Sequence, residues 1–153
     1  FFDPACGCGN FLVITYRELR LLELEVLRAA NAGGQMALAA ACTAHAPHFQ
    51  PGFESADTSV AAAIAFYGYY GWPLSPFPPD APPLFVLHGD LDTVVPVEDA
   101  RAFVDKAQQS SKNPVLYAEL PGAHHNFDLF HSIRSEAVID GVEAFTTWVL
   151  ANR

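Results

Sequence analysis

Basic residues are scarce in this chain of 153 residues, which has 8 Lys and Arg against 17 Asp and Glu. The formal net charge of −9 argues against nonspecific binding to nucleic acid or to anionic membranes, because both depend on clustered positive charge. No apolar run reaches the roughly 18–20 residues that a membrane-spanning helix needs. We therefore expect neither a membrane protein nor a nucleic-acid partner.

Cysteine is also rare, and the 3 cysteines form an odd number. This favours reduced thiols in a cytoplasmic compartment over a disulfide framework. Hydrophobic residues are abundant, at 51%, and charged residues make up only 16%, which predicts a globular protein with a substantial core. Because the chain begins with Phe1 and not with Met, we expect a trimmed or internal segment.

The clearest chemical signal is the stretch 84–96, which reads LFVLHGDLDTVVP. Its apolar start predicts a buried strand that ends at Gly89 and delivers carboxylates onto the following loop. A second unit follows, in which VLYAEL predicts a strand and PGAHHNF places paired histidines beyond it. Parallel α/β sheets keep their chemistry at the carboxyl ends of their strands, so we expect these side chains to meet.

These strings resemble the esterases and lipases of the α/β-hydrolase family that are similar to hormone-sensitive lipase. HGDLDTVVP matches the family's HGxxDxxVP, which implies that Asp92 is the catalytic acid. The alternative is that Asp92 only caps the loop or the next helix, a role for which Asp90 competes. PGAHHNF aligns with GAxHxF, which implies that His125 is the catalytic histidine, with His124 as the runner-up. Adjacent histidine side chains diverge, and no third ligand lies at a suitable spacing, so we expect no metal.

The nucleophile is the weak point of this resemblance. AANAGGQMALAAA is similar to the family's elbow GxSAGG and its helix, and the alignment places Asn31 where the serine belongs. An asparagine carboxamide cannot be activated by an imidazole as a hydroxyl can. We therefore expect a remnant with weak or absent turnover, acting without a cofactor on a small-molecule ester.

The first 28 residues have a different character. DPACGCGNFL resembles motif I of the adenine-N6 DNA methyltransferases, which implies that Asp3, Gly7 and Gly9 could hold S-adenosylmethionine. The base-orienting motif of that family has no match in the rest of the chain. The alternative functions are thus an S-adenosylmethionine-binding fragment or a join of two gene fragments without selected function.

The expected architecture is α/β, with a mainly parallel sheet of about four strands and helices on both faces, forming part of an α/β-hydrolase fold. We expect a strand–loop–helix unit over 1–28 and a hydrolase-like portion over 29–153, packed together as one compact unit. An exposed sheet edge would favour a homo-oligomer. The expected elements are a helix over 11–28, a helix over 33–46, strands within 61–71 and at 84–88 and 115–120, and helices over 97–109 and 133–151.

Overall fold

The computed structural model describes residues 11–14, 25–27, 31–44, 46–71 and 76–152. Its sheet has five strands in the order β2-β1-β3-β4-β5. The strands are β1 (Phe11–Ile14), β2 (Glu25–Leu27), β3 (Ala62–Phe66), β4 (Leu84–Gly89) and β5 (Val115–Leu120). The helices are α1 (Asn31–Cys42), α2 (Val97–Ser110) and α3 (Ile133–Ala151), with a short 3₁₀ turn at Pro47–Phe49.

The strands β3, β4 and β5 form the parallel half of the sheet. Leu84 pairs with Ala63 on one side and with Val115 on the other, and the β4 and β5 ladder runs to Gly89 opposite Leu120. All six residues of β4 are buried, as expected for the apolar central strand of a parallel sheet covered on both faces. The loops that follow β3, β4 and β5 therefore leave from one edge of the sheet.

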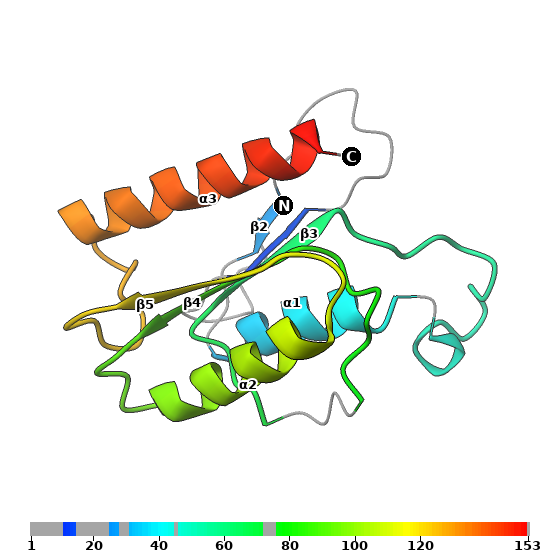
Figure 1. The fold of residues 1–153 in the computed structure, drawn as a ribbon, viewed down its shortest axis with the longest axis horizontal. Helices are drawn as coiled ribbons and strands as arrows, with labels where there is room; N and C mark the ends of the chain where they lie inside the picture. The colour runs from blue at the N-terminus through cyan, green and yellow to red at the C-terminus, as the bar shows by residue number, and fades with distance from the viewer. Residues whose placement is uncertain (1–10, 15–24, 28–30, 45, 72–75, 153) are drawn as a thin grey trace.

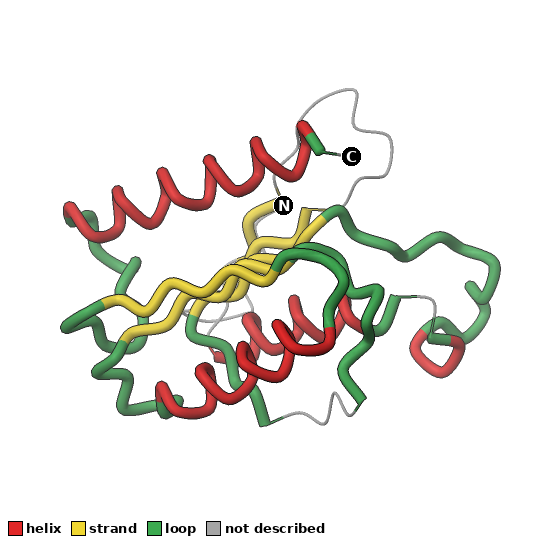
Figure 2. Tube along the Cα trace, viewed as in Figure 1, coloured by secondary structure: helices red, strands yellow, loops and turns green. Residues whose placement is uncertain are grey.

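Helices cover both faces of this sheet, with α1 and α2 on one side and α3 on the other (Figure 1). Alternate residues of the strands divide between two cores, because successive side chains point to opposite faces. Val86 packs with Leu38 of α1 and Val104 of α2, whereas Phe85 packs with Phe145 of α3. Figure 2 shows the same three layers, with the strands between the helices. The α/β prediction with helices on both faces is confirmed.

The predicted helix over 11–28 is wrong where the structure describes this segment. Phe11–Ile14 and Glu25–Leu27 are strands that pair with each other in antiparallel orientation, and β1 also pairs with β3. The apolar run FLVI contains two β-branched residues and covers the free edge of β3, so sheet pairing overrides the helical periodicity. The sheet is accordingly one strand wider than the expected four, and two of its ladders are antiparallel.

The other elements follow the prediction closely, with α2 and α3 each beginning where expected. The helix α1 ends at Cys42 and not at Ala46. Its last turn closes when the Thr43 backbone and hydroxyl both donate to the Ala39 carbonyl, and the chain then turns toward Pro47. At the start of α3, the Ser132 hydroxyl accepts from the Ser135 backbone in a capping arrangement that fixes the first turn.

Candidate active site

The strand β4 delivers Asp92 through a tight turn. The Asp92 amide donates to the Gly89 carbonyl at 3.2 Å, which brings the carboxylate back over the strand end. Gly89 is required at this position because a Cβ there would overlap the carbonyl of Ala123 on the neighbouring loop. The close approach of these two backbones sets the spacing between the loops after β4 and β5.

The Asp92 carboxylate is buried and held by several donors. Its Oδ1 accepts hydrogen bonds from the amides of Val94 at 2.8 Å and Val95 at 2.9 Å. Its Oδ2 lies 2.7 Å from Nδ1 of His125. The aspartate therefore faces the imidazole with one oxygen while the other is fixed by its own loop.

His125 is positioned by the loop after β5 and by an aromatic neighbour. A carboxylate can only accept, so the 2.7 Å contact places the proton on Nδ1 and leaves the lone pair on Nε2. The ring of Tyr67 lies with its centroid 4.5 Å from that of the imidazole, and the Tyr67 hydroxyl donates to Asp128 at 2.8 Å. Only 9% of the His125 side chain is exposed.

The two neighbouring candidates have other contacts. Asp90 accepts a hydrogen bond from the Gly122 amide at 2.6 Å, and Nδ1 of His124 lies 2.8 Å from the Leu91 carbonyl. Both contacts join the loop after β4 to the loop after β5. Asp90 and His124 thus hold the two loops together, and the structure brings Asp92 and His125 into contact.

Asn31 is the first residue of α1. The first turn of this helix lies directly against the loop after β3, because a Cβ on Gly34 would come within 2.6 Å of Gly68 Cα and 2.8 Å of the Phe66 carbonyl. Gly68 follows Tyr67, whose ring contacts His125. The start of α1 is therefore at the same edge of the sheet as His125. Asp3, Gly7 and Gly9 lie outside the described residues.

The sequence allows Tyr67 to line an acyl pocket, although residues at period two on an apolar strand are more often core. In the structure Tyr67 is almost fully buried. Its backbone has φ of 38°, a left-handed conformation that a bulky residue rarely adopts. The chain turns sharply there, and the ring comes to lie against the imidazole. The signal available in the sequence was its place between the strand end and Gly68.

The most shifted titratable groups of this region lie behind Asp92. His88 is completely buried, and burial lowers its pKa from the usual 6.5. Tyr70 is also buried, and its burial raises the pKa of the phenol. Both groups are therefore uncharged at neutral pH.

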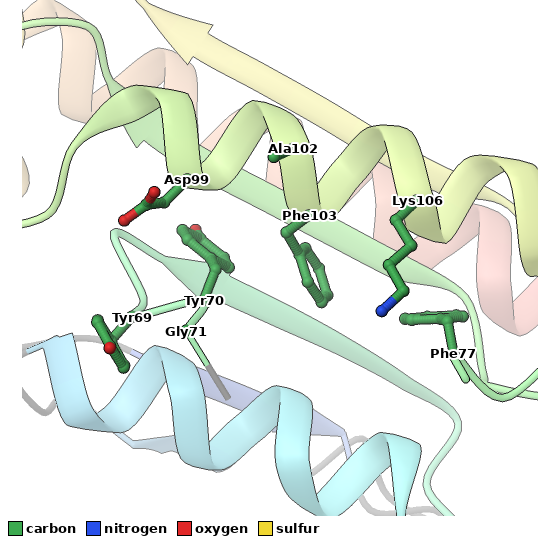
Figure 3. A pocket seen from close by; sticks show the side chains of 8 residues that line it. All are labelled: Tyr69, Tyr70, Gly71, Phe77, Asp99, Ala102, Phe103 and Lys106. Atoms are coloured by element: carbon green, nitrogen blue, oxygen red, sulfur yellow. The ribbon is translucent and has the colours of Figure 1, made fainter. Parts of the chain in front are cut away.

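A pocket of about 420 Å³ lies on the α2 side of this region (Figure 3). It is formed between the loop after β3 and the exposed flank of α2, with the Tyr70 ring stacked on that of Phe103 at 5.2 Å. Its lining residues are Tyr69, Tyr70, Gly71, Phe77, Asp99, Ala102, Phe103 and Lys106.

Two further properties concern the described part of the chain. No group of three or more His, Cys, Asp or Glu side chains gathers there in a way that could hold a metal ion. None of the helices described is both long enough and apolar enough to cross a membrane.

Comparison with known families gives two matches. Residues 1–82 match the model of the DNA-methyltransferase domain of MmeI, and residues 67–152 match that of the prolyl oligopeptidase family. DNA methyltransferase A of Bacillus subtilis is 64% identical over 28 residues, which cover 18% of this chain and 3% of that protein.

The longer relatives are esterases. The "Probable carboxylic ester hydrolase LipM" of Mycobacterium tuberculosis is 40% identical over 158 residues, covering 80% of this chain and 37% of LipM. Esterase LipQ of the same organism is 36% identical over 157 residues, with the same coverage of 80% and 37%. The chain thus spans little more than a third of the length of these relatives.

Solved structures of similar fold include an esterase of Thermogutta terrifontis. With propionate bound, that esterase has a TM-score of 0.58 and 21% identity, covering 82% of this chain and 54% of its own. The form phosphonylated by cyclosarin has a TM-score of 0.59 and 20% identity, covering 76% and 51%. At this identity, the likeness concerns the fold.

Proposed function

The chain belongs to the prolyl oligopeptidase family over residues 67–152 and to the MmeI DNA-methyltransferase domain family over residues 1–82, and we propose that its function is that of a carboxylic ester hydrolase remnant. The observation that carries this proposal is the 2.7 Å contact between Asp92 and His125 at the carboxyl ends of adjacent parallel strands. Esters are preferred over peptides as substrates because the relatives at 40% and 36% identity are named as esterases.

In this proposal, His125 is the general base and Asp92 its orienting group. The lone pair on Nε2 takes a proton from the attacking group, and Asp92 stabilises the imidazolium that forms. The first residue of α1 is Asn31. We propose that it stands where the family's serine would, and its carboxamide offers no hydroxyl for acyl transfer. The remaining route is attack by a water molecule that His125 deprotonates, which supports slow hydrolysis of activated esters.

The test is hydrolysis of p-nitrophenyl butyrate by the wild-type chain and by Asn31→Ser. We expect the wild type to be near background and Asn31→Ser to be clearly faster, since a hydroxyl then stands at the helix start. In the Asn31→Ser background, His125→Ala should lower the rate by roughly 10²–10⁴-fold. His124→Ala is the matched control, because its imidazole contacts only the Leu91 carbonyl among the contacts described.

Either of two outcomes would count against the hydrolase proposal. One is an Asn31→Ser variant that folds and yet hydrolyses no faster than the wild type. The other is an equal loss of rate in His124→Ala and His125→Ala, which would remove the distinction between the two histidines.

A second candidate function is binding of S-adenosylmethionine by the N-terminal segment. It is favoured by the 64% identity over 28 residues with a DNA methyltransferase and by the motif containing Asp3, Gly7 and Gly9. Isothermal titration of S-adenosylmethionine into the wild type and into Gly9→Val tests it. Heat of binding in the wild type that is lost in Gly9→Val would support this function, and no heat in the wild type would eliminate it.

We propose that the chain is a chimera of two gene fragments, joined near residues 28–31. We further propose a homo-oligomer through β5, which has a partner strand on one side only in the described sheet. A monomeric mass in light scattering at high concentration would count against this assembly.

For the compartment we propose the cytoplasm, where thiols such as that of Cys42 stay reduced.

A further inference from the structure

A buried polar cluster around His88 lies next to Asp92. His88 is the fifth residue of β4 and is completely buried. Its Nε2 lies 2.9 Å from the Val95 carbonyl and 3.3 Å from Oδ2 of Asp92. Its Nδ1 lies 3.3 Å from the hydroxyl of Tyr70. This cluster joins the loop after β3, the strand β4 and the loop that carries Asp92.

The contacts of His88 determine where its proton is. A backbone carbonyl can only accept a hydrogen bond, so the 2.9 Å contact with Val95 places the proton on Nε2. The neutral ring then has a lone pair on Nδ1, which accepts from the Tyr70 hydroxyl. Burial lowers the pKa of His88 and raises that of Tyr70, which keeps both groups in these protonation states.

The backbone of Val95 connects this cluster to the pair formed by Asp92 and His125. Its carbonyl accepts from His88, while its amide donates to Oδ1 of Asp92 at 2.9 Å. The Nε2–H of His88 also lies beside Oδ2, the oxygen that faces His125. A displacement of His88 would thus be felt at both carboxylate oxygens.

We propose that His88 is a positioning residue that holds the Asp92 loop against the end of β4 and thereby fixes the orientation of Asp92 toward His125, with Tyr70 fixing the His88 ring. This inference rests on the proposed function, in which Asp92 and His125 are the working pair. It assigns a role to a histidine that acts through Asp92.

Packing alone does not account for a histidine at this place. An apolar side chain would fill the same space between β4 and α2 without a desolvation cost, whereas a buried imidazole is tolerated only if its nitrogens are bonded. His88 has a partner on each nitrogen, and both partners belong to loops at the carboxyl edge of the sheet. Leu84, four residues earlier on the same strand and in the core on that face, shows that apolar residues fit this layer.

The test measures the tautomer of His125 by ¹⁵N nuclear magnetic resonance of selectively labelled histidine, at a pH where the ring is neutral. His125→Gln assigns the resonance. In the wild type we expect the Nδ1–H form to dominate, because Asp92 accepts from Nδ1. In His88→Leu the ratio of Nδ1–H to Nε2–H should fall by about tenfold, the equivalent of one lost hydrogen bond of ~1.4 kcal/mol.

Conservative and matched variants separate positioning from general destabilisation. In His88→Gln the amide can donate to Val95 and accept from Tyr70, so the His125 ratio should stay within about twofold of the wild type. Tyr70→Phe keeps the ring stacked on Phe103 and should lower the ratio by about threefold. Leu84→Ala weakens the same strand and core face and should leave the ratio unchanged.

The outcomes distinguish this inference from the proposed function, because the tautomer is read without turnover. A wild-type His125 with no preference for Nδ1–H would mean that the pair with Asp92 does not form, and the proposed function would fail with it. A wild-type preference that survives unchanged in His88→Leu would overturn the positioning role alone. If His88→Leu does not fold, the other two variants decide. The positioning role of His88 is overturned if the His125 tautomer ratio is unchanged in Tyr70→Phe and falls in Leu84→Ala.

Discussion

The two halves of the sheet differ in what their strand ends carry. In the parallel half, β3, β4 and β5 finish at one edge and are followed by Tyr67, Asp92 and His125. In the antiparallel half, β1 pairs with the other edge of β3, and β2 pairs with β1. Parallel strands bring distant loops to one place, whereas an antiparallel pair completes the sheet without adding to that place.

Close backbone contacts at the carboxyl edge maintain this difference, and removing one should have the largest effect. Gly89→Ala places a methyl group against the Ala123 carbonyl and should destabilise the protein by about 2–3 kcal/mol, measured by urea unfolding. Gly141→Ala is the control, because a Cβ there meets only the Phe85 ring at 3.8 Å, and Ala in a helix should stabilise by about 0.5–1 kcal/mol. Equal stabilities of the two variants would contradict the account.

Disturbing the contact between α1 and the loop after β3 should have the second-largest effect. Gly34→Ala drives a Cβ into Gly68 and the Phe66 carbonyl, and the helix start must move by a few tenths of an ångström or more. We expect a loss of about 1–3 kcal/mol. In the Asn31→Ser background we also expect a lower kcat on p-nitrophenyl butyrate, because the hydroxyl is carried by the displaced turn. A variant with normal stability and kcat would show that α1 does not set the geometry of the site.

Acid should weaken the parallel half through His88. Burial lowers the pKa of His88 in the folded state, so on acidification the unfolded chain takes up the proton first, near 6.5. The contribution of neutral His88 to the free energy of unfolding is therefore complete above that pH and declines as the pH falls below it. The groups that act on this ring are Asp92, His125 and Glu119. Urea unfolding at about pH 7.5 and about pH 5.5 should show a smaller loss in His88→Gln than in the wild type.

Removing the exposed ion pair between Arg101 and Glu119 of β5 should have the smallest effect on the free energy of unfolding. Arg101 of α2 donates two hydrogen bonds to Glu119 and lowers the pKa of that carboxyl, so any stabilisation is present at neutral pH and lost as acid protonates Glu119. Arg101→Met should change the unfolding free energy only slightly at low salt. That difference should shrink further in high salt, and a difference that grows with salt would exclude an electrostatic origin.

The same contrast explains what could be predicted from the sequence. The segments β4, α2 and β5 were predictable because each combines a clear apolar pattern with Gly or Pro at a limit, as in Leu84–Gly89 and Pro96. The run Phe11–Ile14 was misread as helix, because its conformation is set by pairing with β3, some fifty residues away along the chain. Local periodicity cannot report such a partner.

For the candidate site, the motif pattern was sufficient to propose Asp92 and His125, but not the groups around them. The contact of Tyr70 with His88 and that of Tyr67 with His125 each join a motif histidine to a tyrosine that is distant in sequence and belongs to no motif. The choice between His124 and His125 also depends on geometry, since adjacent side chains leave the loop in different directions. One of them contacts the Leu91 carbonyl and the other contacts Asp92.

We propose that the carboxyl edge of the parallel half is a hydrolase site without its nucleophile. The most direct measurement is intact-mass spectrometry of Asn31→Ser after incubation with paraoxon, beside Asn31→Ser/His125→Ala and the wild type. The account predicts one phosphoryl adduct on Ser at position 31, formed only when His125 is present, and none on the wild type. An adduct that forms equally well without His125, or no adduct on a folded Asn31→Ser variant, would contradict it.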